Sequence, residues 1–298
     1  MKKLICITGP TGSGKTNAAI QLAIHYQTEI LSFDSRQFYH EMQIGTAPPS
    51  SEELNLVHHH FIHCRSIHDE YNASTYADDA LSLLKKLFET HDLVIMVGGS
   101  GLYLRAVIDG FSQIPASNPI IRQALNNKLE MEGLDSLQNE LLQADPIYYQ
   151  QVDIYNPARL IRALEVIRDT GKPYSEALKN KSKKHHNFTP LIFMLNPRRE
   201  VLYKSLNQRV DKMMQEGLVD EAKRLFPFRS APPLQTVGYK ELFMYLDGEY
   251  SLEESIDKIK QHTRNYAKRQ ITWFKKMQPE LWPTHIQQAI ERIDMFNQ

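Results

Sequence analysis

The stretch Leu4-Ile-Cys-Ile-Thr8, followed by Gly9-Pro-Thr-Gly-Ser-Gly14-Lys15-Thr16, decides the fold class of this 298-residue chain. It consists of an apolar strand, a glycine-rich turn and the start of a helix pattern, and the turn matches G-x-x-x-x-G-K-[ST] in the context that this motif requires. Glycines let backbone N–H groups converge on an anion, and the helix N-terminus adds partial positive charge. The stretch therefore predicts a P-loop that binds a diphosphate or triphosphate.

The phosphate ligand itself is not specified by this loop. Lys15 is expected to reach the outer phosphate oxygens, and the hydroxyl of Thr16 can ligate Mg²⁺. Ordinary P-loop nucleotide hydrolases add an Asp at the end of a later apolar strand to position that ion. Here the corresponding strand, Leu93 to Val97, runs into Gly98-Gly-Ser-Gly101 instead. The absent Asp argues against an ordinary nucleotide hydrolase.

A second chemical signal is Asp34, which follows the apolar run Glu29 to Phe33. Ligands of open α/β sheets bind beyond the carboxyl ends of the strands, where this acid is expected to lie. Asp34 could accept a proton, ligate a metal through water, or cap the following turn. The residue pattern alone leaves these alternatives open.

Strand-like and helix-like segments alternate through the first 110 residues, which predicts an α/β fold with a parallel sheet covered on both faces. Residues 113–187 are polar, helical in pattern and punctuated by prolines, so we expect an inserted all-helical subdomain there. The core would then comprise residues 1–112 and 188–298. Leu191 to Leu195 should return the chain to the sheet, and Ser251 with Glu254 predicts a capping box that starts a long helix.

Composition excludes several classes of protein. The hydrophobic share is 42% and the charged share 23%, which is ordinary globular composition. Cys6 and Cys64 are the only cysteines, too few for a disulfide framework or a four-cysteine zinc site. We expect a cytoplasmic protein with no membrane partner, because the N-terminal apolar run is too short for a signal peptide and no run approaches a membrane span.

Net charge is zero, so only local clustering can indicate a polyanionic partner. Basic residues gather at 179–186 and at 258–276, where Arg264, Lys268 and Lys275 can share one helix face. Both clusters are compatible with phosphate-backbone contacts and also with solvated surfaces. The run His58-His-His60 with His63 argues weakly for a metal site, since three adjacent histidines cannot all face one ion in a regular element.

The chain resembles the bacterial tRNA dimethylallyltransferases in a series of blocks that follow the P-loop in order. These blocks are Asp34-Ser-Arg-Gln-Phe-Tyr39, Ile44-Gly-Thr-Ala47, His58-His-His-Phe-Ile62, Val97-Gly-Gly-Ser-Gly-Leu-Tyr103, Arg159-Leu-Ile-Arg-Ala-Leu-Glu165, Arg209-Val-Asp-Lys-Met213, Gly217-Leu218, Val237-Gly-Tyr-Lys-Glu241, Tyr245-Leu246 and Thr263-Arg-Asn-Tyr-Ala-Lys-Arg-Gln-Ile-Thr-Trp-Phe274. Their order and spacing are far more specific than a P-loop alone.

This resemblance implies a P-loop core with an inserted helical domain, and transfer of a dimethylallyl group from dimethylallyl diphosphate with Mg²⁺ but without ATP hydrolysis. The acceptor would be N6 of the adenosine 3′-adjacent to the anticodon in tRNAs that read UNN codons, giving N6-isopentenyladenosine and diphosphate. The absent Asp agrees with this expectation. We expect the anticodon stem-loop as the macromolecular partner and a monomeric enzyme.

The resemblance also assigns roles to individual residues. Those expected to bind the donor diphosphate are Gly9, Pro10, Thr11, Gly12, Ser13, Gly14, Lys15 and Thr16, with Thr16 as the metal ligand. Those expected to contact tRNA are Asp34, Ser35, Arg36, Gln37, Ser100, Arg122, Ala158, Arg159, Leu160, Ile161 and Arg162. Ser100 stands where the family usually has Thr, which retains the hydroxyl. The expected catalytic residues are Asp34, Lys15, Thr16 and Arg209.

The chemistry is consistent with these roles. The exocyclic amine of adenine is a poor nucleophile, so a base such as Asp34 near N6 assists as the new C–N bond forms. Lys15, the loop amides, Mg²⁺ and Arg209 would stabilise the charge that develops on the leaving diphosphate. The target base must also leave its stack to be reached.

Two other classes remain as alternatives. A P-loop kinase would use the same loop for ATP and Asp34 to activate a hydroxyl, and it predicts ATP consumption. An RNA-binding switch that holds nucleotide without chemistry predicts tRNA affinity with no change in product mass.

Overall fold

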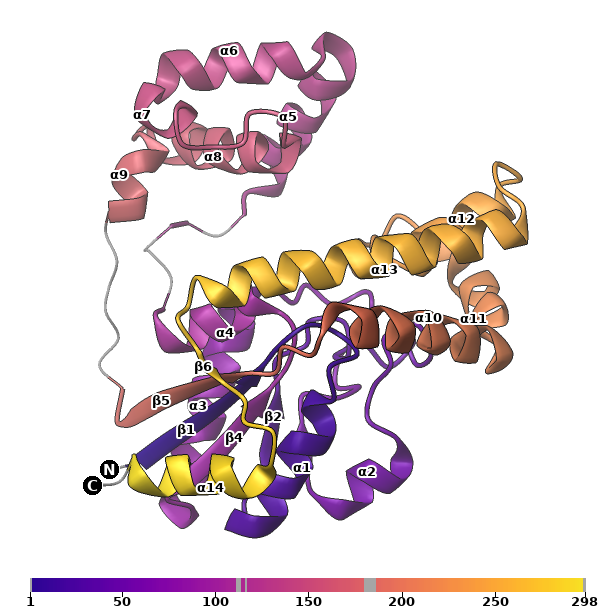
Figure 1. Ribbon diagram of the computed structural model, residues 1–298. Helices are drawn as coiled ribbons and strands as arrows, with labels where there is room; N and C mark the ends of the chain where they lie inside the picture. The colour runs from indigo at the N-terminus through magenta and orange to yellow at the C-terminus, as the bar shows by residue number, and fades with distance from the viewer. Residues whose placement is uncertain (1, 111–113, 116, 180–185, 297–298) are drawn as a thin grey trace. The chain divides into compact units, whose positions relative to one another are not determined.

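The computed structural model describes residues 2–110, 114–115, 117–179 and 186–296 (Figure 1). Most of the basic tract at 179–186 therefore lies outside the described residues. The described chain forms two compact units, one from residues 1–108 and 186–298 and the other from Asp109–His185. The insertion expected from the sequence spans 113–187.

The core unit is built on a six-stranded sheet with the order β3-β2-β4-β1-β5-β6, and every pairing in it is parallel. This sheet confirms the predicted α/β fold. The strands are β1 (Lys2–Thr8), β2 (Ile30–Ser32), β3 (His59–His60), β4 (Leu93–Val97), β5 (Phe188–Met194) and β6 (Glu280–Leu281). The sequence did not predict the two edge strands, since each has only two residues and carries no alternation signal.

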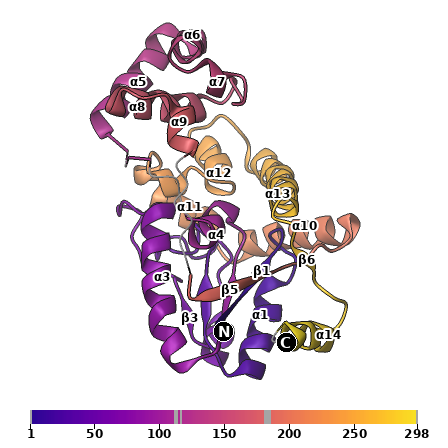
Figure 2. The same ribbon diagram turned by 90° about the vertical axis from the view of Figure 1, so that its left-hand side faces the viewer.

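Both faces of the sheet are covered, and β1 shows why its sequence is apolar throughout. Leu4 and Cys6 pack into the core beneath α3 (Ala73–Thr90) and α4 (Gly101–Ile108), whereas Ile5 and Ile7 pack beneath α1 (Lys15–Tyr26) and α14 (Ile286–Met295). Figure 2 shows α3 on one side of the strands and α1 with α14 on the other. Successive strand residues point to opposite faces, so a strand buried on both faces needs apolar residues at every position.

The helices α10 to α13 of the core unit lie beyond the carboxyl ends of the strands, whereas α2 lies beside α1 (Figure 1). Two of them, α10 (Arg199–Gln215) and α13 (Leu252–Lys275), pack together through Leu202, Leu206 and Ala267. The predicted capping box of α13 is confirmed, because Ser251 and Glu254 each bond the other's backbone N–H. The other elements are α2 (Ser51–Leu56), α11 (Leu218–Leu225), η1 (Phe226–Phe228), η2 (Pro232–Leu234) and α12 (Tyr239–Leu246).

The second unit consists of helices with a core of their own. Its helices are α5 (Pro119–Glu132), α6 (Leu134–Ala144), α7 (Pro146–Tyr149), α8 (Pro157–Thr170) and α9 (Tyr174–Lys179). Leu125, Leu137, Leu141, Leu160 and Leu164 are fully buried among them. A separate core of this kind allows the insertion to fold as a unit without drawing on the sheet.

None of the helices in the described part of the chain is both long enough and apolar enough to cross a bilayer.

Candidate functional site

The turn after β1 adopts the conformation that its glycines permit. Gly9 has φ 142°, and a Cβ atom on it would lie 2.5 Å from the carbonyl oxygen of Leu195. Gly14 has φ 87° and is the N-cap residue of α1. Both φ angles are positive, a region that residues with a side chain rarely adopt. The turn therefore presents its backbone N–H groups at the start of α1, as an anion-binding loop does.

Two basic side chains lie against this loop. The ammonium of Lys15 donates to the carbonyl of Pro10 at 2.7 Å, and Arg209 of α10 donates to the hydroxyl of Thr11 at 2.9 Å. Burial lowers the pKa of Lys15 to about 8, with Asp34 opposing the shift and Arg209 adding to it. Burial also lowers the pKa of Arg209. Two buried cations therefore lie at this loop, and a bound anion would offset the free-energy cost of removing them from water.

Asp34 follows β2 directly and faces the same region. Its carboxylate accepts from the backbone N–H of Arg36 at 3.2 Å. Burial raises the pKa of Asp34, and this shift is opposed by the Arg36 amide and by the charges of Lys15, Arg36 and Arg209. A carboxylate whose pKa is raised in this way is a better proton acceptor than an exposed one.

The loop, Lys15, Asp34 and Arg209 line one cavity of about 760 Å³. Thr16 also lines it, as do His59 and His63, whose Nε2 atoms are buried without a hydrogen-bond partner. A smaller adjoining cavity of about 90 Å³ shares Thr11, Asp34 and Arg209 with the first. Its lining is mixed: charged and hydroxyl side chains stand beside an apolar group formed by Val210, Met213, Leu218, Val237 and Ile259.

The loop Asp34 to Gln37 is held by contacts from several elements. Ser100 is buried, and its hydroxyl accepts from the Ser35 backbone N–H at 2.9 Å and contacts the Ser35 hydroxyl at 2.9 Å. Arg36 donates to the Pro233 carbonyl at 2.9 Å. Gln37 donates to the Ala47 carbonyl at 2.9 Å. Ser100 thus supports the loop that carries the carboxylate.

Sequence reasoning missed Gln270, which joins two of the loops at the site. Its side-chain oxygen accepts from the Thr11 backbone N–H at 2.8 Å, while its amide nitrogen donates to the Gly99 carbonyl at 2.9 Å. Gly99 has no room for a side chain, since a Cβ atom would lie 2.3 Å from that nitrogen. The signal that could have found Gln270 is its place among the apolar positions of the amphipathic helix α13, where an uncharged polar side chain needs a buried partner.

Glu221 of α11 was also missed. It is buried, and it accepts from the backbone N–H groups of Gln43, Ile44 and Gly45 and from the Tyr239 hydroxyl at 2.7 Å. These bonds hold the segment that leads into Thr46 and Ala47 at the cavity wall. The sequence around Glu221 could not predict this role, because its backbone partners at residues 43–45 lie far away in the sequence.

The residues predicted to contact tRNA in the insertion divide into exposed and buried ones. Ala158 and Arg159 are exposed on α8, whereas Leu160 and Ile161 are buried in the helical core. Arg162 donates to the buried Glu165 at 3.1 Å and to the Pro115 carbonyl at 2.5 Å. Ala158 and Arg159 are therefore the most exposed of these five side chains, while Arg162 keeps 30% of its side-chain surface exposed.

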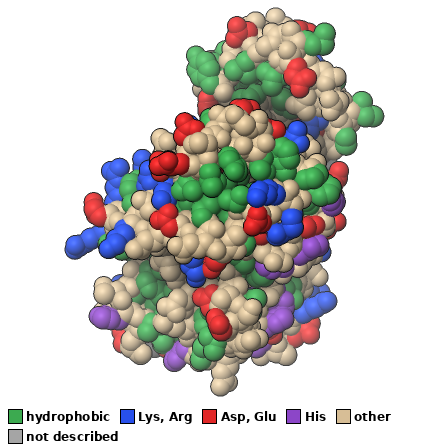
Figure 3. All heavy atoms as spheres, turned by 90° about the vertical axis from the view of Figure 1, so that its right-hand side faces the viewer, with side chains coloured by type: hydrophobic (Ala, Val, Ile, Leu, Met, Phe, Trp, Pro, Cys, Tyr) green, Lys and Arg blue, Asp and Glu red, His purple; other side chains and the backbone are tan. Residues whose placement is uncertain are grey.

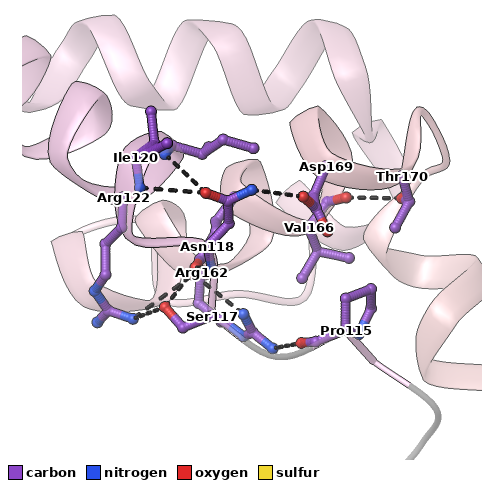
Figure 4. Close-up of polar contacts among 11 residues, drawn as sticks. Pro115, Ser117, Asn118, Ile120, Arg122, Arg162, Val166, Asp169 and Thr170 are labelled. Carbon is purple, nitrogen blue, oxygen red and sulfur yellow. Dashed lines mark hydrogen bonds and ion pairs between the residues drawn. The ribbon is translucent and has the colours of Figure 1, made fainter.

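Arg122 belongs to the same polar cluster as Arg162 (Figure 4). Its guanidinium lies 3.6 Å from Glu165 and bonds the Ser117 hydroxyl at 3.3 Å. Glu165 also accepts from the Asn118 backbone N–H at 2.6 Å. Arg122 and Arg162 thus hold the start of α5 against α8, and Arg122 stays partly exposed while doing so.

A groove of about 750 Å³ lies next to the carboxylate loop in the core unit. It shares Arg36, Thr236, Val237 and Tyr266 with the smaller cavity. Its lining combines aromatic rings and cations, including Arg229, Lys240, Tyr250, Lys258 and Arg269. Figure 3 views the molecule from the side that carries α11 and α12, where Lys and Arg side chains stand on both sides of a hydrophobic patch.

The fold and the cavity together define a P-loop α/β protein in which a phosphate-binding loop faces a carboxylate. Residues 37–277 match the family model described as IPP transferase. The tRNA dimethylallyltransferase of Flavobacterium johnsoniae is 47% identical over 288 residues, covering 95% of this chain and 93% of that protein. The enzyme of the same name from Christiangramia forsetii is 49% identical over 278 residues, covering 93% and 91%.

Solved structures of enzymes with related names also resemble this chain. The full-length tRNA isopentenylpyrophosphate transferase of Bacillus halodurans superposes with a TM-score of 0.70 at 36% identity, covering 99% of this chain and 95% of that one. A eukaryotic dimethylallyltransferase captured acting on tRNA gives 0.77 at 28% identity, covering 92% and 70%. The chain belongs to the IPP transferase family.

Proposed function

We propose that this chain is a tRNA dimethylallyltransferase that joins the dimethylallyl group of dimethylallyl diphosphate to N6 of the adenosine 3′-adjacent to the anticodon, in tRNAs that read UNN codons. The observation that carries the proposal is the convergence of the P-loop, Arg209 and Asp34 on one cavity with an apolar extension. The names of the relatives and of the solved structures support the same reaction.

The donor binds with its diphosphate on the loop Gly9 to Thr16. Lys15 and Arg209 contact the phosphate oxygens, and Thr11 is held for this contact by the Arg209 guanidinium. The dimethylallyl group lies in the smaller cavity, against Val210 and Met213. The apolar side chains of this lining offer the hydrocarbon van der Waals contact.

Prenyl transfer breaks the bond between C1 of the donor and its bridging oxygen and forms a bond between C1 and N6. The electron pair of the broken bond leaves with the diphosphate, where Lys15, Arg209 and the loop N–H groups stabilise it. The proton leaves N6 for the carboxylate of Asp34, whose raised pKa suits a base. Ser35 and Gln37 position the adenine beside it.

The donor set in the cavity fits Mg²⁺, because Thr16 offers a hydroxyl oxygen and the diphosphate would offer further oxygens. When bound, the ion supplies positive charge to the leaving group. Thr16 is the side chain of this chain that would hold it.

The anticodon stem-loop binds to the groove that adjoins Asp34 and to the exposed face of α8. Arg229, Lys240, Lys258 and Arg269 in the groove can pair with phosphates, and Tyr250 and Tyr266 offer rings for stacking. The target adenine is extruded from the loop before it enters the site. The enzyme acts as a monomer in the cytoplasm.

Mass spectrometry of an unmodified UNN-reading tRNA tests this function. The tRNA is incubated with the protein, Mg²⁺ and dimethylallyl diphosphate, and then digested to nucleosides. We expect one dimethylallyl group on one adenosine. Transfer of phosphate from ATP to an acceptor, with no prenyl gain, would replace this proposal with the kinase alternative.

A further inference from the structure

Glu29, His58 and His60 form a cluster at the edge of the sheet, apart from the cavity. β2 and β3 pair in parallel with Ile30 opposite His59, and the Ile30 N–H donates to the His58 carbonyl at 3.0 Å. The His60 Nε2 lies 2.6 Å from the Glu29 carboxylate. One potential ligand atom from each of the three residues lies within 4.8 Å of the others.

The alternation of β3 explains how neighbouring histidines share one face. Residues i and i+2 of a strand point to the same side, so His58 and His60 face Glu29 together, with their rings 4.3 Å apart. His59 points elsewhere, since it contacts the Val57 carbonyl and lines the P-loop cavity. A metal site here needs two histidines and the carboxylate that directly precedes the neighbouring strand β2, rather than three consecutive histidines.

The geometry is close to what a tetrahedral ion requires. Ligand bonds of about 2.0–2.2 Å place neighbouring ligand atoms roughly 3.3 Å apart on a tetrahedral zinc ion. The Glu29–His60 pair at 2.6 Å would have to open slightly, and His58 would have to move inward. His58 is exposed, which leaves its side chain room to rotate toward the other two.

His91 supplies a further partner for the carboxylate. Its Nε2 lies 3.7 Å from the Glu29 oxygen that His60 does not contact. A hydrogen bond to the free oxygen orients a ligating carboxylate, and a small shift of His91 would bring it within hydrogen-bond distance. Lys2 donates to the His91 carbonyl at 3.0 Å and to the Asp92 carboxylate at 2.8 Å, so its charge is paired with Asp92.

We propose that Glu29, His58 and His60 form a binding site for a divalent transition metal of the zinc class, with His91 orienting the carboxylate. Imidazole nitrogens favour zinc, copper or nickel over magnesium, so this site is distinct in chemistry from the one that Thr16 serves. It is also distinct in place, because Glu29 precedes β2 whereas Asp34 follows it. The ion fastens the two-residue edge strand β3 to β2 and restricts the backbone of His59 between its ligands.

Metal analysis of the full chain, purified without a polyhistidine tag, tests this proposal. The protein is loaded with Zn²⁺, dialysed against metal-free buffer and analysed by inductively coupled plasma mass spectrometry, with titration calorimetry for the affinity. We expect one bound ion per chain and a Tm that rises by several degrees with Zn²⁺ but not with Mg²⁺. Co²⁺ in its place should give the intense visible absorption of a tetrahedral nitrogen and oxygen site.

The variants His58→Gln, His60→Gln and Glu29→Gln should each weaken Zn²⁺ binding at least ~10-fold. His25→Gln is the matched control, because His25 is an exposed histidine on α1 outside the cluster, and it should bind Zn²⁺ as the parent does. Circular dichroism verifies that each variant is folded. Zinc binding that survives in all three variants, or a parent chain that retains no zinc and gives no tetrahedral Co²⁺ spectrum, would overturn the proposal.

Discussion

The side-chain amide of Gln270 bonds both the Thr11 N–H and the Gly99 carbonyl, so a single residue of α13 couples the P-loop to the turn after β4. Gln270→Leu leaves the buried Gly99 carbonyl and the partly buried Thr11 N–H without this partner, which costs about 1–3 kcal/mol. We expect that loss in the free energy of unfolding and a KM for dimethylallyl diphosphate raised ~10-fold. Chemical denaturation and steady-state kinetics measure the two effects.

Gln261→Leu, an exposed position on the same helix, is the control and should change neither quantity. Gln270→Glu separates the two bonds, because it keeps the acceptor for Thr11 and adds a negative charge near the diphosphate. It should raise the donor KM more than Gln270→Leu does. Equal donor KM values for the parent and both variants would exclude this positioning role.

Asp34→Asn tests the base. The amide keeps an oxygen for the Arg36 N–H but cannot accept the N6 proton, so kcat should fall by ~10²–10⁴ while tRNA affinity changes little. Because burial raises the pKa of Asp34, kcat/KM of the parent should fall with unit slope as the pH drops through that raised value. A variant whose acid limb is unchanged would show that another group titrates there.

The lowered pKa of Lys15 predicts how the affinity for the donor depends on pH. Its pKa is lowered to about 8 in the free protein by burial, so its charge is lost as the pH rises through that value. A bound diphosphate favours the charged form and raises this pKa. Affinity for the donor should therefore weaken above pH 8, with proton uptake on binding, as calorimetry in two buffers of different ionisation enthalpy can measure. Lys15→Arg should remove the proton uptake, since Arg stays charged.

Glu221→Gln tests how much the hydrogen bonds of Glu221 to residues 43–45 stabilise the protein. The substitution turns an acceptor of backbone N–H groups into a side chain whose own N–H₂ faces them, and hydrogen bonds to a charged group contribute about 1.5–3 kcal/mol each. We expect a loss of several degrees in Tm. Asp220→Asn, on the exposed side of the same helix, should leave Tm within a degree or so.

Arg159 and Arg162 should behave differently although both were expected at the tRNA. Arg159→Ala removes an exposed charge, so it should weaken tRNA binding and lower the slope of log K against log salt by about 1, with Tm unchanged. Arg162→Ala removes a partner of buried Glu165 and should lower Tm of the insertion. Filter binding over a range of salt and calorimetric melting distinguish them; an unchanged salt slope in Arg159→Ala would remove α8 from the proposed interface.

Several parts of the structure could be predicted because their signals are local. The four inner strands of the sheet, the P-loop turn and the capping box at Ser251 are each encoded by residues adjacent in sequence, and each lies close to where it was expected. The edge strands β3 and β6 could not be predicted, since two residues carry no periodicity. The sequence also did not indicate that His58 and His60 point to the same face. This follows only from the pairing of β3 with β2, which makes the segment a strand.

The sequence by itself determined that an anion-binding loop opens the chain and that a carboxylate follows the next strand, because backbone conformation and strand polarity act over a few residues. Only the tertiary structure decided what surrounds them. Arg209 reaches Thr11 across 198 positions and Gln270 reaches it across 259, and neither contact has a local signature. Buried polar groups are stable only when they are hydrogen-bonded. Their partners here come from α10 and α13, which pack beyond the carboxyl ends of the strands.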